Sequence, residues 1–368
     1  MRHSKLGSVA LAGALALALA SCSGGGADGG ASGEPDAPAE SLTMLIGSSG
    51  EAETTAVQAA ADAWAAESGV DVEVIAASDL NQELAQGFAG DSAPDVFYMG
   101  WDQFQTYASD GFLEPYAMDL ENAGEFYPAL VDTFSYEGEF ICAPKDFSTL
   151  GLVINTQLWA DAGLTEADIP TDWESLQSAA ETLTSGDVVG LSMGAEYARL
   201  GVFMEQAGGG LMDGDTVTAS SPENVEALEY DFPDVEFEVV ELPAGPAGPG
   251  TFTFSNCWGI PEGQETADPA QELVAFLTSD EQQLEFAEAF GVIPSTESAA
   301  ATYAETYPEN AAFVAGADYA VSPVAFSGAA DVVGEFNNAI TTLQGADAQA
   351  VLDQVQSQLE AAHQASQG

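Results

Sequence analysis

An alternation of short apolar segments with amphipathic helical segments begins near Leu42, and it restricts the possible folds more than any other feature of the chain. The segments at residues 43–46, 70–74 and 95–99 have the composition or the alternation of strands, and stripes of helical period lie between them. Strands that alternate with helices form a parallel sheet covered by helices on both faces. The sequence therefore predicts an α/β fold.

The middle of the chain repeats this pattern less regularly. Strands are predicted at residues 151–154 and 188–193, and a weaker alternation predicts another strand within residues 251–260. A helix with capping-box spacing begins at residues 171–174, and the chain is mostly helical after residue 268. Because a chain of 368 residues exceeds the size at which a single core stops growing, we expect two lobes.

The N-terminus has the layout of a secretory signal. A short basic head precedes an apolar run at residues 6–20, which is too short to span a bilayer comfortably. The run ends just before Cys22 in a sequence that resembles the site where bacterial lipoproteins are cleaved and lipidated. We therefore predict a lipoprotein signal peptide at residues 1–21 and a flexible tether at residues 22–40. The alternative is an ordinary signal peptide with a chance cysteine.

Acidic residues dominate the charge of the chain. It has 60 Asp and Glu but only four Lys and Arg, which gives a formal net charge of −56 at pH 7. Without residues 1–21, Lys145 and Arg199 are the only cations left. Nucleic acid is excluded as a partner because nothing could neutralise its phosphates. Since 46% of the residues are hydrophobic, a large core can form and the acidity belongs to the surface.

Two cysteines remain after Cys22, namely Cys142 and Cys257. An even pair of cysteines in an exported chain usually forms a disulfide, and we predict one here. The alternative is a pair of buried free thiols.

Four segments, in the same order along the chain, resemble the extracellular solute-binding proteins of the maltose-binding type, which serve sugar importers. The segments are a Pro-Asp-apolar block with a later Gly-x-Leu, an Asn-x-x-Leu stretch ending in Gly-Leu, a Pro-x-x-Trp helix start, and a helix pair before a Gly-x-x-Pro turn. They lie at residues 93–97 with 111–115, 154–164, 170–174 and 273–294.

The resemblance implies a two-lobe periplasmic-binding-protein-like α/β fold of type II, with hinge strands and a ligand cleft between the lobes. We predict that lobe 1 consists of residues 41–145 and 257–320, and that lobe 2 consists of residues 146–256 and 321–362. The family has a longer segment after the position of Tyr230, so we also predict a shortened second lobe.

Polar and aromatic residues follow two of the predicted strands. Ser49 follows the first strand, and Trp101 and Asp102 follow the third. Ligands of parallel sheets lie beyond the carboxyl ends of the strands, and sugar sites combine flat rings with hydrogen-bonding groups. We predict all three residues as ligand contacts. The alternative for Trp101 and Asp102 is a helix cap with a packing tryptophan.

The two scarce cations lie beside further candidates. Lys145 is followed by Asp146, and Arg199 closes a short run that begins with Glu196 and Tyr197. A residue type that is nearly absent from the surface is expected where a specific anion or hydroxyl needs it. All five residues are predicted ligand contacts, with structural ion pairs as the alternative for the cations.

Trp258 and Phe326 are further candidates for stacking rings, with burial in the core as the alternative. Residues 190–194 match the Gly-x-Ser-x-Gly pattern of serine hydrolases, but the only downstream histidine is His363, in a polar C-terminal tail. We therefore predict no catalytic residues, no cofactor and no metal site.

These observations predict a non-enzymatic lipoprotein, anchored through Cys22 at the extracellular face of the cell membrane. It is expected to be monomeric and to pass a neutral mono- or oligosaccharide to the membrane permease of an ABC importer. Three alternatives remain: a protein of the same fold that binds a polyamine or metal cation, an exported carbohydrate-active enzyme, and a surface protein without a transport role.

Overall fold

The computed structural model describes residues 41–366 except 91, 187, 195, 215, 230–238 and 342–346. The predicted signal peptide at residues 1–21, the tether at residues 22–40 with its lipidation site Cys22, and the predicted shortening after Tyr230 lie outside the described residues. Among the helices of the described part, none has both the length and the apolar composition needed to cross a bilayer.

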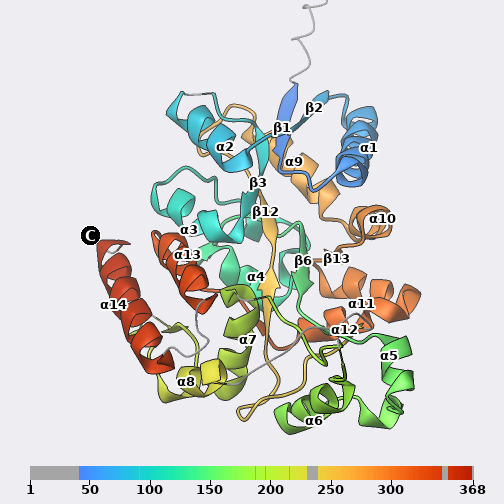
Figure 1. The fold of residues 1–368 in the computed structure, drawn as a ribbon. Helices are drawn as coiled ribbons and strands as arrows, with labels where there is room; N and C mark the ends of the chain where they lie inside the picture. Colours follow the sequence, from blue (N-terminus) through green and yellow to red (C-terminus); the bar gives the residue numbers. More distant parts are fainter. Residues whose placement is uncertain are drawn as a thin grey trace, which may run out of the picture. The chain divides into compact units, whose positions relative to one another are not determined.

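The N-terminal part of the chain folds around a sheet with the strand order β12-β3-β1-β2 (Figure 1). The strands β1 (Leu42–Ile46), β2 (Val72–Ala76) and β3 (Val96–Gly100) are parallel, as predicted. The strand β12 (Asn256–Gly259) returns from far along the chain and pairs antiparallel with β3. The helices that follow the three parallel strands are α1 (Glu51–Ser68), α2 (Leu80–Ala89) and α3 (Trp101–Ser109).

The largest hydrophobic core lies between this sheet and its helices. Helix α1 buries Val57, Ala61 and Trp64, which recur at the spacing of one helix face. The strands β1 and β3 are buried along most of their length, as apolar strands are when helices cover both faces of a sheet. The apolar residues 44–46 and 96–99 therefore lie at the centre of the core.

A second sheet has the strand order β13-β6-β11-β14. Its central strands β6 (Asp146–Thr149) and β11 (Thr251–Phe254) are antiparallel, with Ser148 opposite Phe254. Only one residue separates β11 from β12, so the chain passes directly from the second sheet to the first. The edge strands are β13 (Ile293–Pro294) and β14 (Ala320–Val321).

A disulfide joins Cys142 to Cys257 close to this passage. The two Cα atoms are 5.7 Å apart, and both residues are fully buried. Pro144 pairs with Cys257 in an isolated bridge, and the Lys145 N–H donates to the Asn256 carbonyl at 2.8 Å. The two chain segments that run between the sheets are therefore joined covalently and by backbone hydrogen bonds.

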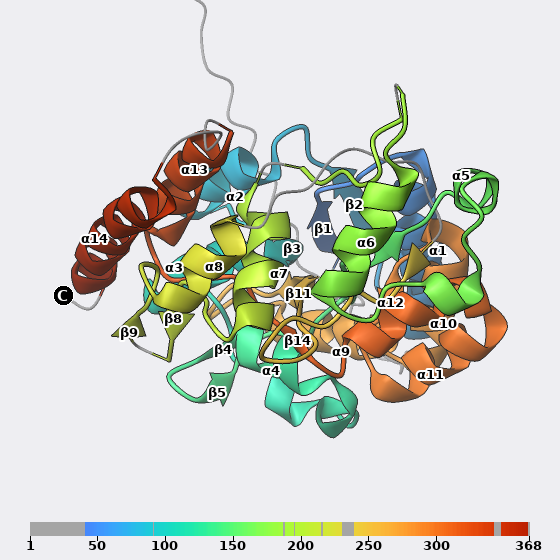
Figure 2. The ribbon, with the colours of Figure 1, turned by 60° about the horizontal axis from the view of Figure 1, so that its bottom comes forward.

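A second hydrophobic core is built mostly by helices. Helix α7 contributes more buried residues to this core than any other helix and packs against α8 and α13, while α13 and α14 lie side by side (Figure 2). The helices of this core are α6 (Trp173–Leu183), α7 (Tyr197–Ala207), α8 (Pro222–Glu229), α13 (Ala329–Ile340) and α14 (Ala348–Ser366).

The segment at residues 188–193, predicted as a strand, has no regular strand structure. Val188 makes only an isolated bridge with Ser185. The Gly190 N–H donates to the Thr184 hydroxyl at 3.0 Å, and a β-carbon on Gly190 would lie 1.8 Å from the Ala180 carbonyl oxygen. Because the segment packs this tightly against the end of α6, its backbone bonds with that helix end and not with a sheet.

Helix starts agree well with the sequence. Asp172 and Ser175 form a capping box before α6, as predicted for residues 171–174, and Ser279 caps α10. The remaining helices are α4 (Pro128–Thr133), α5 (Thr156–Asp161), α9 (Ala267–Leu277), α10 (Asp280–Phe290), α11 (Glu297–Thr306) and α12 (Ala311–Gly316). The remaining short strands are β4 (Ser135–Tyr136), β5 (Glu139–Phe140), β7 (Leu152–Val153), β8 (Met212–Asp213), β9 (Thr216–Val217) and β10 (Val239–Val240).

Candidate functional site

A cavity of about 320 Å³ lies at the carboxyl ends of β1 and β3, and we call it the Trp101 cavity. Five chain segments line it: the loop after β1 with the first turn of α1, the end of β3 with the start of α3, strand β6 with Lys145, the passage from β11 to β12, and the end of α10 with the turn after it. Its lining residues are Gly47, Ser49, Glu53, Gly100, Trp101, Asp102, residues 145–148, residues 254–256, Phe290 and Val292.

The start of α3 supplies an aromatic ring and a carboxylate to this cavity. Trp101 is half-buried, and its ring packs edge-on against Phe254 with 6.0 Å between the ring centroids. Asp102 is exposed. A β-carbon on Gly100 would lie 2.6 Å from the Asp102 Oδ1 atom, so a glycine lets this carboxylate fold back over the end of β3. A ring beside an exposed carboxylate can stack on an apolar sugar face and accept hydrogen bonds from its hydroxyls.

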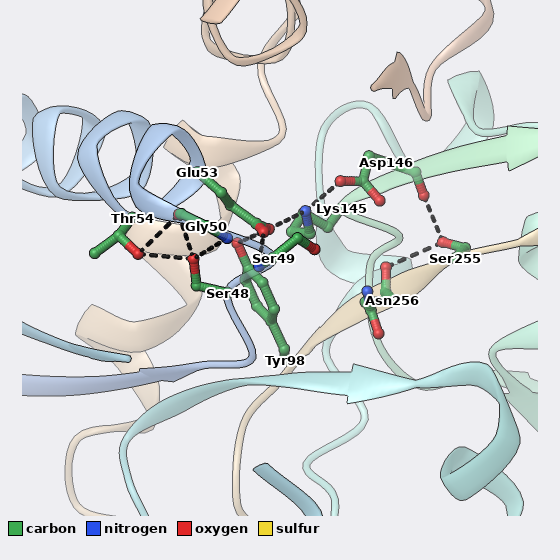
Figure 3. A network of polar contacts seen from close by, with 10 residues as sticks. All are labelled: Ser48, Ser49, Gly50, Glu53, Thr54, Tyr98, Lys145, Asp146, Ser255 and Asn256. Atoms are coloured by element: carbon green, nitrogen blue, oxygen red, sulfur yellow. Dashed lines mark hydrogen bonds and ion pairs between the residues drawn. The ribbon is translucent and has the colours of Figure 1, made fainter. Parts of the chain in front are cut away.

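Glu53 is at the centre of a buried polar network on one wall of the cavity (Figure 3). Only 2% of this residue is exposed. Its Oε1 atom accepts a hydrogen bond from the Tyr98 hydroxyl at 3.1 Å and pairs with the Lys145 Nζ at 3.3 Å. Its Oε2 atom accepts from the Ser49 N–H at 2.8 Å. Burial, together with the negative charges of Glu53 and Asp146, raises the pKa of Tyr98 well above its usual value, so the phenol keeps its proton.

Lys145 forms ion pairs with two carboxylates, those of Glu53 and Asp146. The side chain of Lys145 is only 3% exposed, and its ammonium group also lies over the rings of Tyr98, at 4.6 Å, and Phe286, at 4.5 Å. Burial raises the pKa of Asp146 above its ordinary value, while the neighbouring lysine opposes that rise. The cation of this cavity is therefore held within the protein by carboxylates and rings.

A second cavity, of about 450 Å³, contains Arg199, and we call it the Arg199 cavity. The Arg199 Nη1 atom lies 2.5 Å from the Glu196 Oε1, and both side chains are nearly half exposed. Strand β6 contributes to both cavities: Asp146, Phe147 and Ser148 line the first, and Thr149 lines the second. The other lining residues are Leu176, Phe203, Leu242, Phe313 and residues 150–153 and 191–194.

Five of the predicted ligand contacts line the Trp101 cavity together: Ser49, Trp101, Asp102, Lys145 and Asp146. Arg199 lines the second cavity, with Glu196 paired to it.

The other three predicted contacts line neither cavity. Tyr197 is buried in the second core, with its ring 5.3 Å from that of Phe252. Trp258 is buried in the first core against Tyr98, and the Phe326 ring packs on His363.

The cavity also contains residues that were not predicted from the sequence, among them Glu53, Phe254 and Asn256. Glu53 is one of 60 acidic residues, and nothing in its local sequence distinguishes it from an exposed acid in a first helical turn. Phe254 is the last residue of β11 and lies opposite Ser148 on β6. Knowledge of how these two strands pair would have placed Phe254 beside the cavity. Within the described ranges, no group of three or more His, Cys, Asp or Glu residues could hold a metal ion.

Glu205 on α7 is a carboxyl outside both cavities, and burial raises its pKa to about 7. Since the folded-state pKa exceeds the unfolded value, the fold loses stability as the pH rises from about 4.5 to 7. Glu205→Gln is therefore expected to raise the free energy of unfolding by roughly 1–3 kcal/mol at pH 8 and to leave it almost unchanged at pH 4.5. Urea unfolding at both pH values measures this difference.

The matched control is Glu174→Gln on the exposed face of α6, which is expected to have little effect at either pH. An equal change for Glu205→Gln at pH 4.5 and pH 8 would contradict the proposed titration.

Comparison with known proteins gives a family and a fold. Residues 47–284 match the family described as bacterial extracellular solute-binding protein. No curated protein sequence matches the chain. Three similar solved structures are the cyclic α-maltosyl-1,6-maltose binding protein from Arthrobacter globiformis, the GacH receptor of Streptomyces glaucescens and UgpB from Mycobacterium tuberculosis.

The Arthrobacter protein has 21% sequence identity and a TM-score of 0.75, and the match covers 88% of this chain and 98% of that chain. GacH was solved unliganded and with acarbose and an acarbose homolog. It has 20% sequence identity and a TM-score of 0.73, and the match covers 88% of this chain and 99% of that chain. UgpB, in complex with glycerophosphocholine, has 16% sequence identity and a TM-score of 0.73, and the match covers 87% of this chain and 97% of that chain. The predicted two-lobe α/β fold of periplasmic binding proteins is thus confirmed.

Proposed function

The chain belongs to the bacterial extracellular solute-binding proteins, and from this premise we propose that it captures a neutral mono- or oligosaccharide for an ABC importer. The ligand would lie in a cleft to which both the Trp101 cavity and the Arg199 cavity contribute. Proteins of this family bind solutes for transport, so no catalytic step is part of the proposal.

One observation carries this proposal: a half-buried Trp101 ring, packed edge-on to Phe254, stands beside the exposed Asp102 carboxylate in a cavity of about 320 Å³. Rings next to hydroxyl acceptors suit a pyranose, which has apolar faces and a polar rim. Two of the similar structures support a saccharide ligand: the Arthrobacter protein is named for binding cyclic α-maltosyl-1,6-maltose, and GacH was solved with acarbose.

The proposal extends to the organisation of the chain. Lobe 1 would comprise residues 41–145 and 257–320, and lobe 2 residues 146–256 and 321–362. The largest core draws on residues of the first set and the helical core on residues of the second, which supports this division. Lipidation at Cys22 would hold a monomer at the extracellular face of the membrane, beside its permease.

A cationic ligand is the second candidate. Three carboxylates, Glu53, Asp102 and Asp146, line the Trp101 cavity together with a single lysine, so its lining has an excess of negative charge. An amine such as spermidine would complement that charge.

Calorimetry with the purified protein separates the two candidates. We expect at least one saccharide from a panel of maltose, maltotriose, maltotetraose and trehalose to bind with a Kd in the micromolar range. This corresponds to a binding free energy of about −8 kcal/mol. Spermidine serves as the competing ligand. Binding of spermidine alone would overturn the proposal for a neutral saccharide in favour of a cation.

Trp101→Ala is expected to weaken binding of the best saccharide about 10- to 100-fold, because the ring that stacks on the sugar is lost. Trp101→Phe should restore part of the affinity. Met118→Ala, at a side chain that is 63% exposed and lines neither cavity, is the control. Equal affinity in the Trp101→Ala variant and the control would remove Trp101 from the binding site.

A further inference from the structure

The Glu53 carboxylate joins three parts of the structure that lie far apart in the sequence. Its three donors are the Ser49 N–H in the loop after β1, the Tyr98 hydroxyl on β3 and the Lys145 ammonium before β6 (Figure 3). The last two donors are almost completely buried. The loop at residues 47–50 is thereby linked to the interior through one side chain.

The other hydrogen bonds of this loop are local. The Ser48 hydroxyl donates to the Gly50 carbonyl at 2.7 Å and accepts from the Thr54 hydroxyl at 2.7 Å. These bonds shape the turn, but they do not connect it with β3 or with the segment before β6. Among the hydrogen bonds that the structure describes for residues 47–50, only the one from Ser49 to Glu53 makes that connection, and Ser49 also lines the cavity.

Lys145 has little capacity left for a ligand. Its ammonium group has three donor hydrogens, and two carboxylates and the aromatic rings around it already satisfy the charge. Its side chain is 3% exposed, whereas Ser49 and Asp102 on the same cavity are exposed.

We infer that Glu53 is a positioning residue of the Trp101 cavity: it fixes the loop at residues 47–50 in the conformation that a ligand meets, and Lys145 is its counterion. The expected effect of Glu53 on ligand affinity rests on the proposed function, whereas its effect on the conformation of the loop at residues 47–50 is independent of that function.

Glutamine at position 53 tests this role because an amide cannot replace both ends of the carboxylate. A carboxylate accepts hydrogen bonds at both oxygens, whereas an amide accepts at one and donates at the other. In Glu53→Gln, the amide oxygen is expected to stay with Tyr98 and Lys145, because leaving those buried groups unpaired costs more than leaving an exposed loop N–H to water. The amide NH₂ would then face the Ser49 N–H and release the loop.

The experiment measures hydrogen exchange of the ligand-free protein and maltotetraose binding for the wild type and for Glu53→Gln. We expect exchange at Ser49 and Gly50 to become at least tenfold faster, with little change in β1, β3 or β6. Maltotetraose affinity is expected to fall about tenfold, because the competent loop conformation is then a minor population. The control is Glu51→Gln, an exposed acid in the same helical turn.

Unchanged exchange at Ser49 and Gly50 would overturn the inference, and so would a uniform increase across the core strands, which indicates a purely structural role. If the wild type binds no saccharide, the proposed function fails, while the exchange data still decide the role of Glu53 in the loop. If Glu53→Gln does not fold, Ser49→Pro provides the second variant, because it removes the same N–H donor without touching the carboxylate. An unchanged maltotetraose affinity in that variant would also overturn the inference.

Discussion

Lys145→Met is expected to lower the free energy of unfolding by about 3–5 kcal/mol, because it leaves two buried carboxylates without their cation. Glu53 is 2% exposed and Asp146 is 7% exposed, so water cannot replace the ammonium group. Methionine keeps most of the apolar stem of lysine, which limits the loss of packing against the surrounding rings. Urea unfolding at pH 7 measures the change.

Arg199→Met is the matched control, since it removes the other cation of the described chain from an ion pair that is nearly half exposed. The expected loss there is about 0–1 kcal/mol. Similar losses for the two variants would contradict the assignment of Lys145 to a buried network. Recovery of stability in Lys145→Met on adding Glu53→Gln and Asp146→Asn would support it.

Replacing both Cys142 and Cys257 with alanine is expected to destabilise the fold by about 4–5 kcal/mol. The disulfide closes a loop across a sequence separation of 115 residues, and cross-links of long loops remove the most entropy from the unfolded chain. Both residues are also fully buried, so the change leaves space in the first core. Thermal unfolding of the double variant measures the loss.

Mass spectrometry after alkylation in denaturant provides the chemical check on this disulfide. Cys142 and Cys257 should be modified only after reduction. Modification of both residues in the unreduced protein would show two free thiols, and the loss of stability in the double variant would then be expected to be only that of a small core cavity.

The first sheet could be predicted from the sequence because its strands are short and mostly apolar or alternating, whereas the helices between them carry apolar stripes of helical period. The strands at residues 43–46 and 95–99 and the buried face of α1 follow from local pattern alone. The location of Ser49 and Trp101 in one cavity follows from a topological rule, since parallel strands bring their carboxyl ends to the same edge of the sheet.

The parts that could not be predicted depend on contacts between distant segments. Residues 188–193 have the composition of a strand, but their backbone bonds with the end of α6. Tyr197 and Arg199 lie two residues apart on α7, yet one is buried in a core and the other is exposed in a cavity. Neither the rotation of that helix nor the burial of Glu53 can be obtained from local sequence, because both are set by the elements that pack against them.

The burial of Lys145 also determines how the protein reacts with chemical reagents. It is the only lysine in the sequence besides Lys5, so the surface formed by the described residues exposes almost no side-chain amine. Dyes and cross-linkers that acylate amines would therefore leave this surface unmarked. Acylation of Lys145 in the native protein would require the structure around its side chain to open locally, and the rate of acylation would report how often that opening occurs.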